Sequence, residues 1–415
     1  MLTCLHDATL IDGTGQILEN HSLLINDQTI QALGPTEKLQ IPAKAKVYPL
    51  AGKYVLPGII DAHIHLDMHG LPDTYHESLV EHKLRTIRSA IEMSNTVRAG
   101  VTTVRNMGSA HLIDIAVKRA VKEELIVGPR ILACGKIISM TAAGNGYFPE
   151  LYRQADGIDE NRKAAREQLQ GGADLLKIMA TGAIMNPGGE PGAPLLDIDE
   201  MRAVVREGQK ENKHTAAHAH GAQGIKNAVK AGVRTIEHGT LADEDALKLM
   251  ADSGVYLIST LSSNFWMVRS AGKKGIPKFM FEKAEEISKI RVETLNMALD
   301  LGVKVVMGTD AGTPYNYHGK NCMELVQYVD KGIMSPMEAI VASTGTAAEA
   351  VGLGHCTGTL QPGKAADCLV LKQDPLENIN CLLDLDCIHM IFKEGALIKG
   401  EVDTQQWNTS SPLGL

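Results

Sequence analysis

The sequence predicts an α/β fold: a (β/α)8 TIM barrel with a small β-sandwich built from both chain ends. Segments typical of strands and helices alternate between residues 55 and 352, in units of about 30 residues, which favours a closed parallel barrel. Short strand-like pieces separated by turns fill residues 1–54 and return over 353–405. The 415 residues are enough for a barrel of about 250 residues and a second module.

Residues 1–54 read as an antiparallel β module. Strand-like pieces at 8–11, 22–25 and 29–33 are each followed by turn residues such as Asp12-Gly13 or Gly34-Pro35. A module this small lacks a core of its own. We therefore expect it to pair with the β pieces at 358–360, 366–371, 387–392 and 396–398, so that 1–54 and 353–405 form one composite sandwich.

The barrel is expected to occupy residues 55–352. After a first strand within 55–68, strands are predicted at 101–104, 130–134, 175–179, 214–220, 233–238, 255–260 and 303–307. Helices are predicted at 79–98, 113–122, 159–169, 197–212, 221–231, 243–252 and 283–301, with two more at 325–331 and 336–351.

The net charge and the composition argue against several classes of binding partner. A net charge of −8 and few aromatic residues argue against nucleic-acid and membrane-surface binding, and no apolar run reaches the roughly 20 residues that span a bilayer. The seven cysteines are scattered without a CxxC pair, which favours reduced thiols, and the first residues do not resemble a signal peptide. We expect a cytoplasmic protein whose partner is a small-molecule substrate.

Metal-binding residue types gather at the expected strand ends, where barrels place reacting groups. His63 and His65, two apart on a strand, present both imidazoles to one side. The other candidates are Lys177 on strand four, His218 and His220 on strand five, His238 after strand six and Asp310 after strand eight. A single one of these histidines could be an ordinary core residue bonded to a carbonyl. Together they favour a site for zinc-like ions.

Lys177 lies in the apolar segment L-L-K-I-M-A. Burial of an unpaired ammonium is costly and lowers its pKa. A neutral amine can add carbon dioxide to form a carbamate that bridges two metals. The alternative is a lysine paired with a neighbouring acid.

The motifs L-P-G-I-I-D-A-H-I-H, K-I-M-A-T-G, A-H-A-H-G, T-I-E-H-G and G-T-D-A-G occur in this order, and G-T-L-Q-P-G-K-A-A-D follows them. In this the chain resembles the amidohydrolase superfamily. It is most similar to the prolidase-like dipeptidases and carboxypeptidases of the Xaa-Pro and Xaa-Arg type, and to the related ochratoxin-type amide hydrolases.

The resemblance implies two divalent metal ions. His63, His65 and Asp310 would hold one, His218 and His238 the other, and N6-carboxylated Lys177 would bridge them. Zinc is expected, although manganese or cobalt would suit the same ligands. A metal-bridging hydroxide would attack the amide carbonyl, with Asp310 carrying the proton to the leaving nitrogen. His220 would contact the oxyanion or the substrate; alternatively it is a packing histidine.

The chain departs from these relatives after strand three. They often show a Gly-Gly-His turn, whereas residues 141–147 here read T-A-A-G-N-G-Y. We name Asn145 and Tyr147 from this turn as candidate substrate-binding residues. The loop 186–192 could be a lid or an inert connection.

The predicted function is hydrolysis of an amide or peptide bond in a small carboxylate-bearing substrate, a dipeptide or an N-acyl amino acid. The alternatives are a cyclic-amide hydrolase, similar to imidazolonepropionase or dihydropyrimidinase, and a non-catalytic scaffold. The relatives also imply a homo-oligomer.

Overall fold

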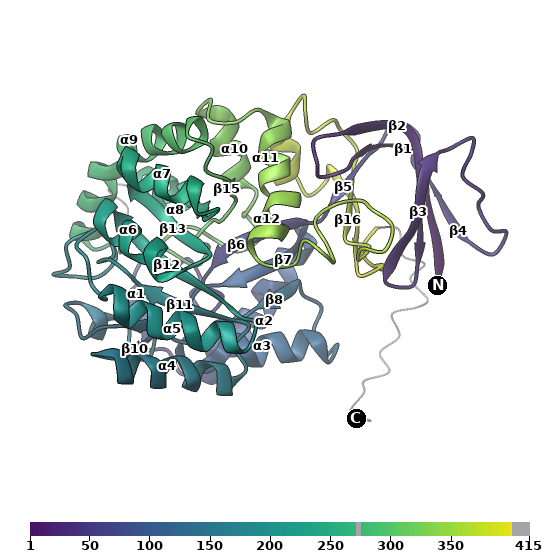
Figure 1. Cartoon of the computed structure of the whole chain (residues 1–415). Coiled ribbons are helices and arrows are strands. Elements are labelled where there is room, and N and C mark those ends of the chain that lie inside the picture. The colour runs from purple at the N-terminus through teal and green to yellow at the C-terminus, as the bar shows by residue number, and fades with distance from the viewer. Residues whose placement is uncertain (271–274, 401–415) are drawn as a thin grey trace.

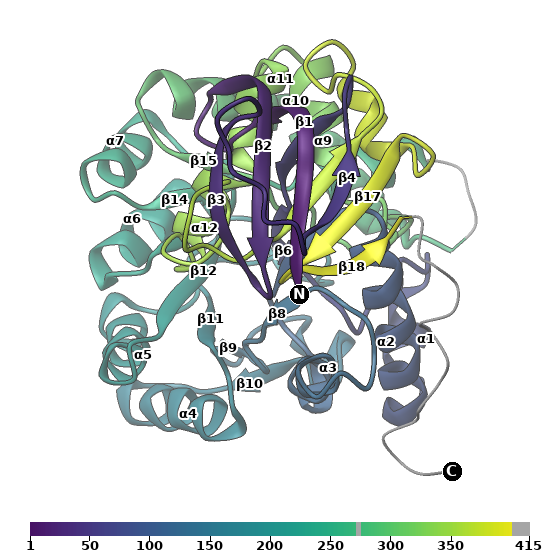
Figure 2. The same cartoon turned by 90° about the vertical axis from the view of Figure 1, so that its right-hand side faces the viewer.

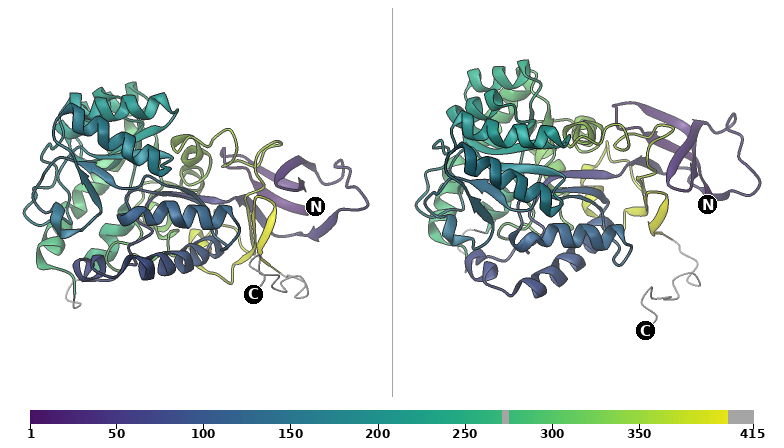
Figure 3. Two further views of the ribbon diagram at one scale, coloured as in Figure 1. Left: turned by 90° about the horizontal axis from the view of Figure 1, so that it is seen from below. Right: turned by 60° about the horizontal axis from the view of Figure 1, so that its bottom comes forward.

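The computed structural model describes residues 1–270 and 275–400. It has two parts: a barrel of strands surrounded by helices, and a sheet at one side of the barrel that contains the first and the last strands of the described chain (Figure 1). Figure 3 shows that sheet as a lobe at one end of the barrel.

Parallel strands form the barrel wall. One sheet has the order β6-β7-β8 and the other the order β10-β9-β11-β12-β13-β14-β15. Hydrogen bonds link the two sheets at both seams, from Ala62 N to Met307 O (3.0 Å) and from Asp174 N to Ala133 O (2.7 Å). The strands are β6 (Ile59–Ile64), β7 (Val101–Asn106), β8 (Arg130–Leu132), β9 (Ile137–Ser139), β10 (Tyr152–Gln154), β11 (Leu175–Met179), β12 (His214–Gly221), β13 (Thr235–Leu241), β14 (Tyr256–Ile258) and β15 (Val305–Val306). Their parallel pairing and their alternation with helices confirm the predicted α/β class.

The third barrel position is a broken strand. The sequence predicts one strand at 130–134, but β8 ends at Leu132 and β9 begins at Ile137. Gly135 between them has a φ of +69°, which no regular strand adopts, and its N–H donates to Asp114 Oδ2 at 2.9 Å. β8 pairs with β7, and β9 pairs with β11, so the break separates the two sheets.

Helices cover the outside of the barrel (Figure 1). Several of them begin at acidic caps; for example, Asp197 forms a capping box with Glu200, and Asp243 accepts from the N–H of Ala246. The helices are α1 (Thr74–Ser78), α2 (His82–Arg98), α3 (Ile113–Lys122), α4 (Ile158–Gly171), α5 (Ile198–Lys210), α6 (Ala222–Ala231), α7 (Glu244–Asp252), α8 (Leu261–Arg269), α9 (Lys278–Asp300), α10 (Met323–Asp330), α11 (Pro336–Ala342) and α12 (Gly345–Ala350), with 3-10 turns at Ala110–Leu112, Asn145–Tyr147 and Ile379–Leu383. Within the described ranges, no helix has the length and apolar character needed to cross a membrane.

Strands from both chain ends form one sheet (Figure 2). Its order is β18-β17-β16-β5-β1-β2-β3, with β4 pairing β1. β5 and β16 pair antiparallel with Val55 opposite Val370, which joins the first strands to the last. The strands are β1 (Leu2–Ile11), β2 (Ile17–Asn26), β3 (Thr29–Pro35), β4 (Lys46–Pro49), β5 (Tyr54–Pro57), β16 (Cys368–Leu371), β17 (Ile388–Lys393) and β18 (Ala396–Lys399).

The two halves of this sheet enclose one apolar core, in which Leu10 and Leu23 lie with Val370 and Phe392. Division into a composite domain (1–54 and 353–405) and a barrel (55–352) stays our proposal. Strand β5 begins at Tyr54 and so crosses that boundary. Residues 401–405 lie outside the described ranges.

Candidate active site

Five histidines converge at one end of the barrel. His63 lies on β6 and His65 directly after it, and their ring centroids are 5.5 Å apart. His218 and His220, two apart on β12, have ring centroids 4.7 Å apart. His238 on β13 joins the two groups, at 4.8 Å from His63 and 4.6 Å from His218. Residues 175 positions apart in the chain therefore meet at one point.

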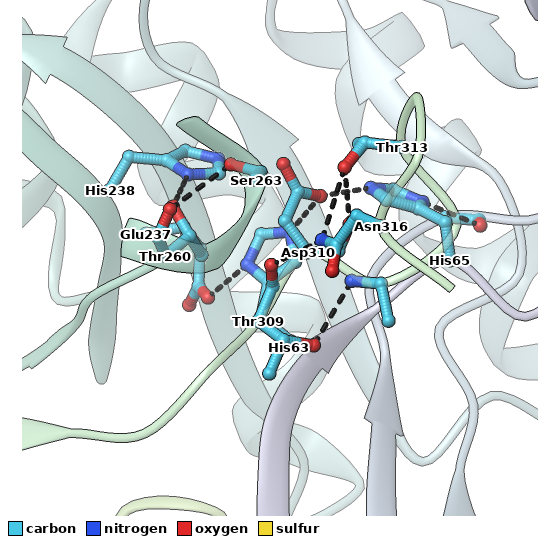
Figure 4. Close-up of polar contacts among 12 residues, drawn as sticks. His63, His65, Glu237, His238, Thr260, Ser263, Thr309, Asp310, Thr313 and Asn316 are labelled. Carbon is cyan, nitrogen blue, oxygen red and sulfur yellow. Dashed lines mark hydrogen bonds and ion pairs between the residues drawn. The ribbon is translucent and has the colours of Figure 1, made fainter. Parts of the chain in front are cut away.

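Asp310 lies against the first pair (Figure 4). Its Oδ1 is 3.5 Å from Nε2 of both His63 and His65. One atom from each of these three residues lies within 4.8 Å of the others, so that one metal ion could bind all three.

The backbone is left-handed at two of the site residues. His238 has a φ of +72° and Asp310 a φ of +58°. The β12–β13 register shifts after the pair Ala219–His238, and the Asp310 N–H donates to the His63 carbonyl at 2.7 Å. Non-glycine residues adopt this conformation uncommonly, and Asp and His are among the residue types that tolerate it best.

Hydrogen bonds at Nδ1 orient four of the rings. His63 donates to Glu237 Oε2 (2.7 Å) and His65 to the Gly108 carbonyl (3.0 Å), while His220 and His238 bond the hydroxyls of Thr240 (3.0 Å) and Thr260 (2.8 Å). This leaves Nε2 for other partners, as in metal-bound histidines.

These rings fit a metal in two further respects. Nε2 of His63 and of His218 are buried without a hydrogen-bond partner in the described part of the chain. Burial also lowers the pKa of His63 to about 4 and that of His220 to about 3, so both are neutral at pH 7. Neutral imidazole is the form that binds a cation.

Lys177 on β11 is 2 % exposed and lines the same cavity. No hydrogen bond or ion pair joins its Nζ to another residue of the described ranges. Burial lowers the pKa of its ammonium, although the Glu237 carboxylate partly opposes this. The alternative was a lysine paired directly with an acid, and the described residues contain no such pair. The neutral amine is the form of lysine that can be carboxylated.

Glu237 and Arg105 are site residues that the sequence did not reveal. Glu237 is fully buried, bonds His63, and accepts from Arg105 Nη2 at 2.9 Å. Burial would raise the pKa of Glu237, but Arg105 and His63 outweigh it and bring it to about 2. Strand alternation predicts that neighbours point to opposite faces. The left-handed backbone at His238 lets Glu237 and His238 both reach the interior. The available signal in the sequence was an acid directly before the candidate ligand His238, at the end of the predicted strand 233–238.

The candidate metal-binding residues line a cavity of about 780 Å3, open solvent at its mouth included. Besides these residues its wall is mainly apolar. It comprises Met68, Ile137, Phe148, Leu151, Tyr152, Met179, Ala183, Ile184, Met185, Asn186, Ser263, Asn264, Met267, Ala284, Arg291 and Thr313. Much of it comes from the segment after β9 and from α8 and α9.

Asn145 and Tyr147 lie beside this cavity and are not among its described lining residues. Asn145 Oδ1 accepts from Asn186 Nδ2 at 3.2 Å, and Tyr152 donates to Asn186 Oδ1 at 3.2 Å. Asn145 therefore holds a residue of the 186–192 loop that does line the cavity. Tyr147 packs on other aromatic rings, with its centroid 5.2 Å from that of Tyr75. Direct substrate contact by either residue stays a prediction.

The fold is that of an amidohydrolase. The sequence model of the Amidohydrolase family matches residues 54–398, and the chain belongs to that family. It is a hydrolase that acts on amide bonds, as predicted.

Its relatives include prolidases and ochratoxinase, which confirms the predicted branch. Ochratoxinase of Aspergillus niger is 29 % identical over 96 % of this chain and 87 % of its own length. The crystal structure of A. niger ochratoxinase has a TM-score of 0.89 at 27 % identity, covering 99 % of both chains. A prolidase complexed with N-methylphosphonate-L-proline has a TM-score of 0.89 at 29 % identity, covering 97 % of this chain and 100 % of its own. A Xaa-Pro dipeptidase with methionine bound in its active site has a TM-score of 0.88 at 30 % identity, covering 96 % of this chain and 100 % of its own.

Proposed function

We propose that this amidohydrolase cleaves the amide or peptide bond of a small carboxylate-bearing substrate, a dipeptide or an N-acyl amino acid, with two divalent cations. The observation that carries the proposal is the convergence of five histidines, Asp310 and Lys177 on one apolar cavity. The relatives support the substrate class, since one is a prolidase complexed with a proline phosphonate and another a Xaa-Pro dipeptidase.

The proposed metal ligands follow from their chemistry and positions. His63, His65 and Asp310 would hold one ion, His218 and His238 the other, and carboxylated Lys177 would join them. Imidazole and carboxylate donors suit zinc. When bound, the cations would polarise the scissile carbonyl and lower the pKa of water toward neutrality.

Asp310 is the proposed proton carrier. Its carboxylate lies at the cavity between two imidazoles, where it can accept the proton of the attacking water and pass it to the leaving nitrogen. His220 is the proposed contact to the substrate oxygen. If the Thr240 hydroxyl donates to its Nδ1, its Nε2 carries the proton and can donate to the oxygen that gains negative charge.

The test combines metal analysis with a substrate panel. We expect protein purified without chelator to contain about two equivalents of divalent ion. The zinc-loaded enzyme should hydrolyse at least one member of a panel of Xaa-Pro, Xaa-Arg and Xaa-Phe dipeptides and N-acyl amino acids. Cleavage of cyclic amides alone would support the cyclic-amide alternative, and protein without metal or turnover would support a scaffold.

We also propose that the enzyme is cytoplasmic and forms a homo-oligomer. Light scattering on the eluate of a size-exclusion column measures the mass of the assembly directly, and a single 44.7 kDa species would contradict the second proposal.

A further inference from the structure

Arg291 is a buried arginine that has no ion-pair partner within the described ranges. It lies on α9, is 4 % exposed and lines the cavity. The other two buried arginines each have a carboxylate partner: Arg85 pairs with Asp67 at 2.7 Å and Arg105 with Glu237 at 2.9 Å. Arg291 forms no ion pair with any acid of the described ranges. Its hydrogen bond there runs from Nη2 to Thr260 Oγ1, at 2.6 Å.

The two acids with the largest electrostatic effect on Arg291, Glu324 and Asp310, already have other partners. The Glu324 carboxylate accepts from the N–H groups of Leu261 (2.9 Å) and Ser262 (2.7 Å), and from two serine hydroxyls. Asp310 lies between His63 and His65. Burial lowers the pKa of Arg291, and these two acids only partly oppose it. A buried guanidinium without a counter-charge is costly, so an anion that enters the cavity is favoured at this point.

The surroundings of Arg291 indicate where such an anion would lie. Thr260 Oγ1 also bonds His238 Nδ1 at 2.8 Å, so the guanidinium is one hydroxyl away from a proposed metal ligand. The rest of the wall presents Phe148, Leu151, Met179 and Met267. Thioether and aromatic groups accept bulky apolar groups of varied shape.

We propose that Arg291 binds the free carboxylate of the substrate while the apolar wall accepts a large apolar group of the same molecule. Arginine suits this role because its planar donors match both oxygens of a carboxylate. The inference rests on the proposed function and adds to it the anchoring residue and an apolar substrate class. Arg291 acts here as a specificity-determining residue.

The test compares matched substrates in the zinc-loaded full-length enzyme. Xaa-Pro and Xaa-Phe dipeptides are assayed as free acids and as C-terminal amides, on the wild type, Arg291→Met and Arg291→Lys. We expect Arg291→Met to raise KM for the acids about 10- to 100-fold, and to change KM for the amides about threefold or less, because only the acids lose a charge-assisted contact. Arg291→Lys should fall between, since it keeps the charge and loses the planar geometry.

Binding provides a readout that does not need turnover. Calorimetry with N-acetyl-L-phenylalanine and its uncharged amide should show that the wild type prefers the acid and that Arg291→Met loses this preference. If the wild type binds the acid through Arg291 but hydrolyses nothing in the panel, the proposed function fails and the carboxylate site stands. If Arg291→Met keeps the acid preference in both assays, the carboxylate site is refuted.

Two control variants distinguish carboxylate binding by Arg291 from a purely structural role of Arg291 in positioning Thr260. Thr260→Val removes the hydroxyl that joins Arg291 to His238, so it should impair acids and amides equally and lower zinc content. Arg269→Met removes an exposed arginine on α8 and should change neither the ratio of KM for acids and amides nor the ratio of their binding constants. An equal loss for acids and amides in Arg291→Met, with loss of zinc, would mean that Arg291 only braces Thr260, and would overturn the proposal.

Discussion

At the scale of single residues, the site depends on buried charges whose partners come from distant strands. Asp310 is held by its N–H bond to the His63 carbonyl, in a left-handed backbone that favours Asn or Asp over most residues. Glu237 connects His63 to Arg105 within the barrel. The two acids differ in exposure, since the Glu237 side chain is fully buried whereas Asp310 lines the cavity. We therefore assign a positioning role to the first and a catalytic role to the second.

Asp310→Asn should retain the fold and much of the metal but lower kcat about 10²- to 10⁴-fold, because the amide cannot carry a proton. Asparagine tolerates the left-handed backbone, so thermal unfolding should be nearly unchanged. Steady-state kinetics, thermal unfolding and elemental analysis of one preparation test this. Near-full activity would remove Asp310 from its proposed role.

Glu237→Gln should weaken zinc binding about 10- to 100-fold, because the anion that orients His63 is lost. It should also lower the free energy of unfolding by about 1–3 kcal/mol, because Arg105 is left buried without a counter-charge. Competition with a coloured chelator and denaturant unfolding measure the two effects. Glu285→Gln, an exposed change on α9, is the matched control and should alter neither. Unchanged zinc affinity in Glu237→Gln would contradict the positioning role.

Lys177→Ala should lose most of its metal, since the proposed bridging carbamate cannot form. Short carboxylates such as acetate or propionate should restore part of the activity by filling the space with a similar anion. Activity is measured against carboxylate concentration at fixed zinc, with chloride as the salt control. Full metal content in the alanine variant would show that the lysine does not bridge.

At the scale of elements, Arg130 joins the barrel to the terminal sheet. From β8 its guanidinium reaches Asp367 Oδ2 at 2.9 Å and Glu394 Oε1 at 2.6 Å, next to β16 and β17. Burial would raise the pKa of Glu394, but Arg130 and Lys393 outweigh it and hold that pKa below its ordinary value. This contact therefore depends on pH, and it links two parts of the chain that also share the main apolar core.

Arg130→Met should reduce the free energy of unfolding at pH 7 by about 1–3 kcal/mol, because Asp367 is left buried without its partner. A carboxyl with a lowered folded pKa adds stability above its unfolded pKa, and this is lost as pH falls through the folded value. The difference between wild type and variant should therefore shrink below about pH 4.3. Denaturant unfolding across pH measures it, with the exposed Arg119→Met as control. A difference that is constant with pH would exclude the linkage.

At the scale of the whole molecule, the barrel holds crowded neutral imidazoles at one end, together with a lysine that has no ion-pair partner among the described residues. The His218, His220 and His238 rings lie 4.6–5.0 Å apart, and burial lowers the pKa of each ring. Such a constellation binds cations only when the strands are assembled, so metal binding should be linked to folding.

Zinc should therefore raise the thermal stability of chelator-treated protein in a concentration-dependent manner. A hundredfold excess over Kd corresponds to about 2.7 kcal/mol, provided the unfolded chain does not bind zinc. Differential scanning calorimetry over a zinc series measures the shift, and Lys177→Ala should respond less. A Tm independent of zinc in the wild type would argue against a metal centre at this end of the barrel.

Much of the fold and of the candidate site could be predicted, because both follow from the pattern of apolar and polar residues along short segments of the chain. Strand four was predicted at the residues that form β11, and the pairing of both chain ends followed from their missing core. The candidate metal-binding residues could be named because parallel strands bring their ends together. The split of β8 from β9 was not predicted, since it depends on Gly135 and its contact with Asp114.

The sequence by itself determined the alternation of strands and helices along the barrel, and which residue types stand at the strand ends, because both depend on short-range periodicity. Only the tertiary structure decided that Glu237 joins His63 to Arg105, that Asn145 and Tyr147 lie beside the cavity, and that Arg291 lines it without an acid partner in the described part of the chain. These relations involve residues far apart in the chain. They depend on backbone turns and side-chain directions that arise only when the strands and helices are packed together.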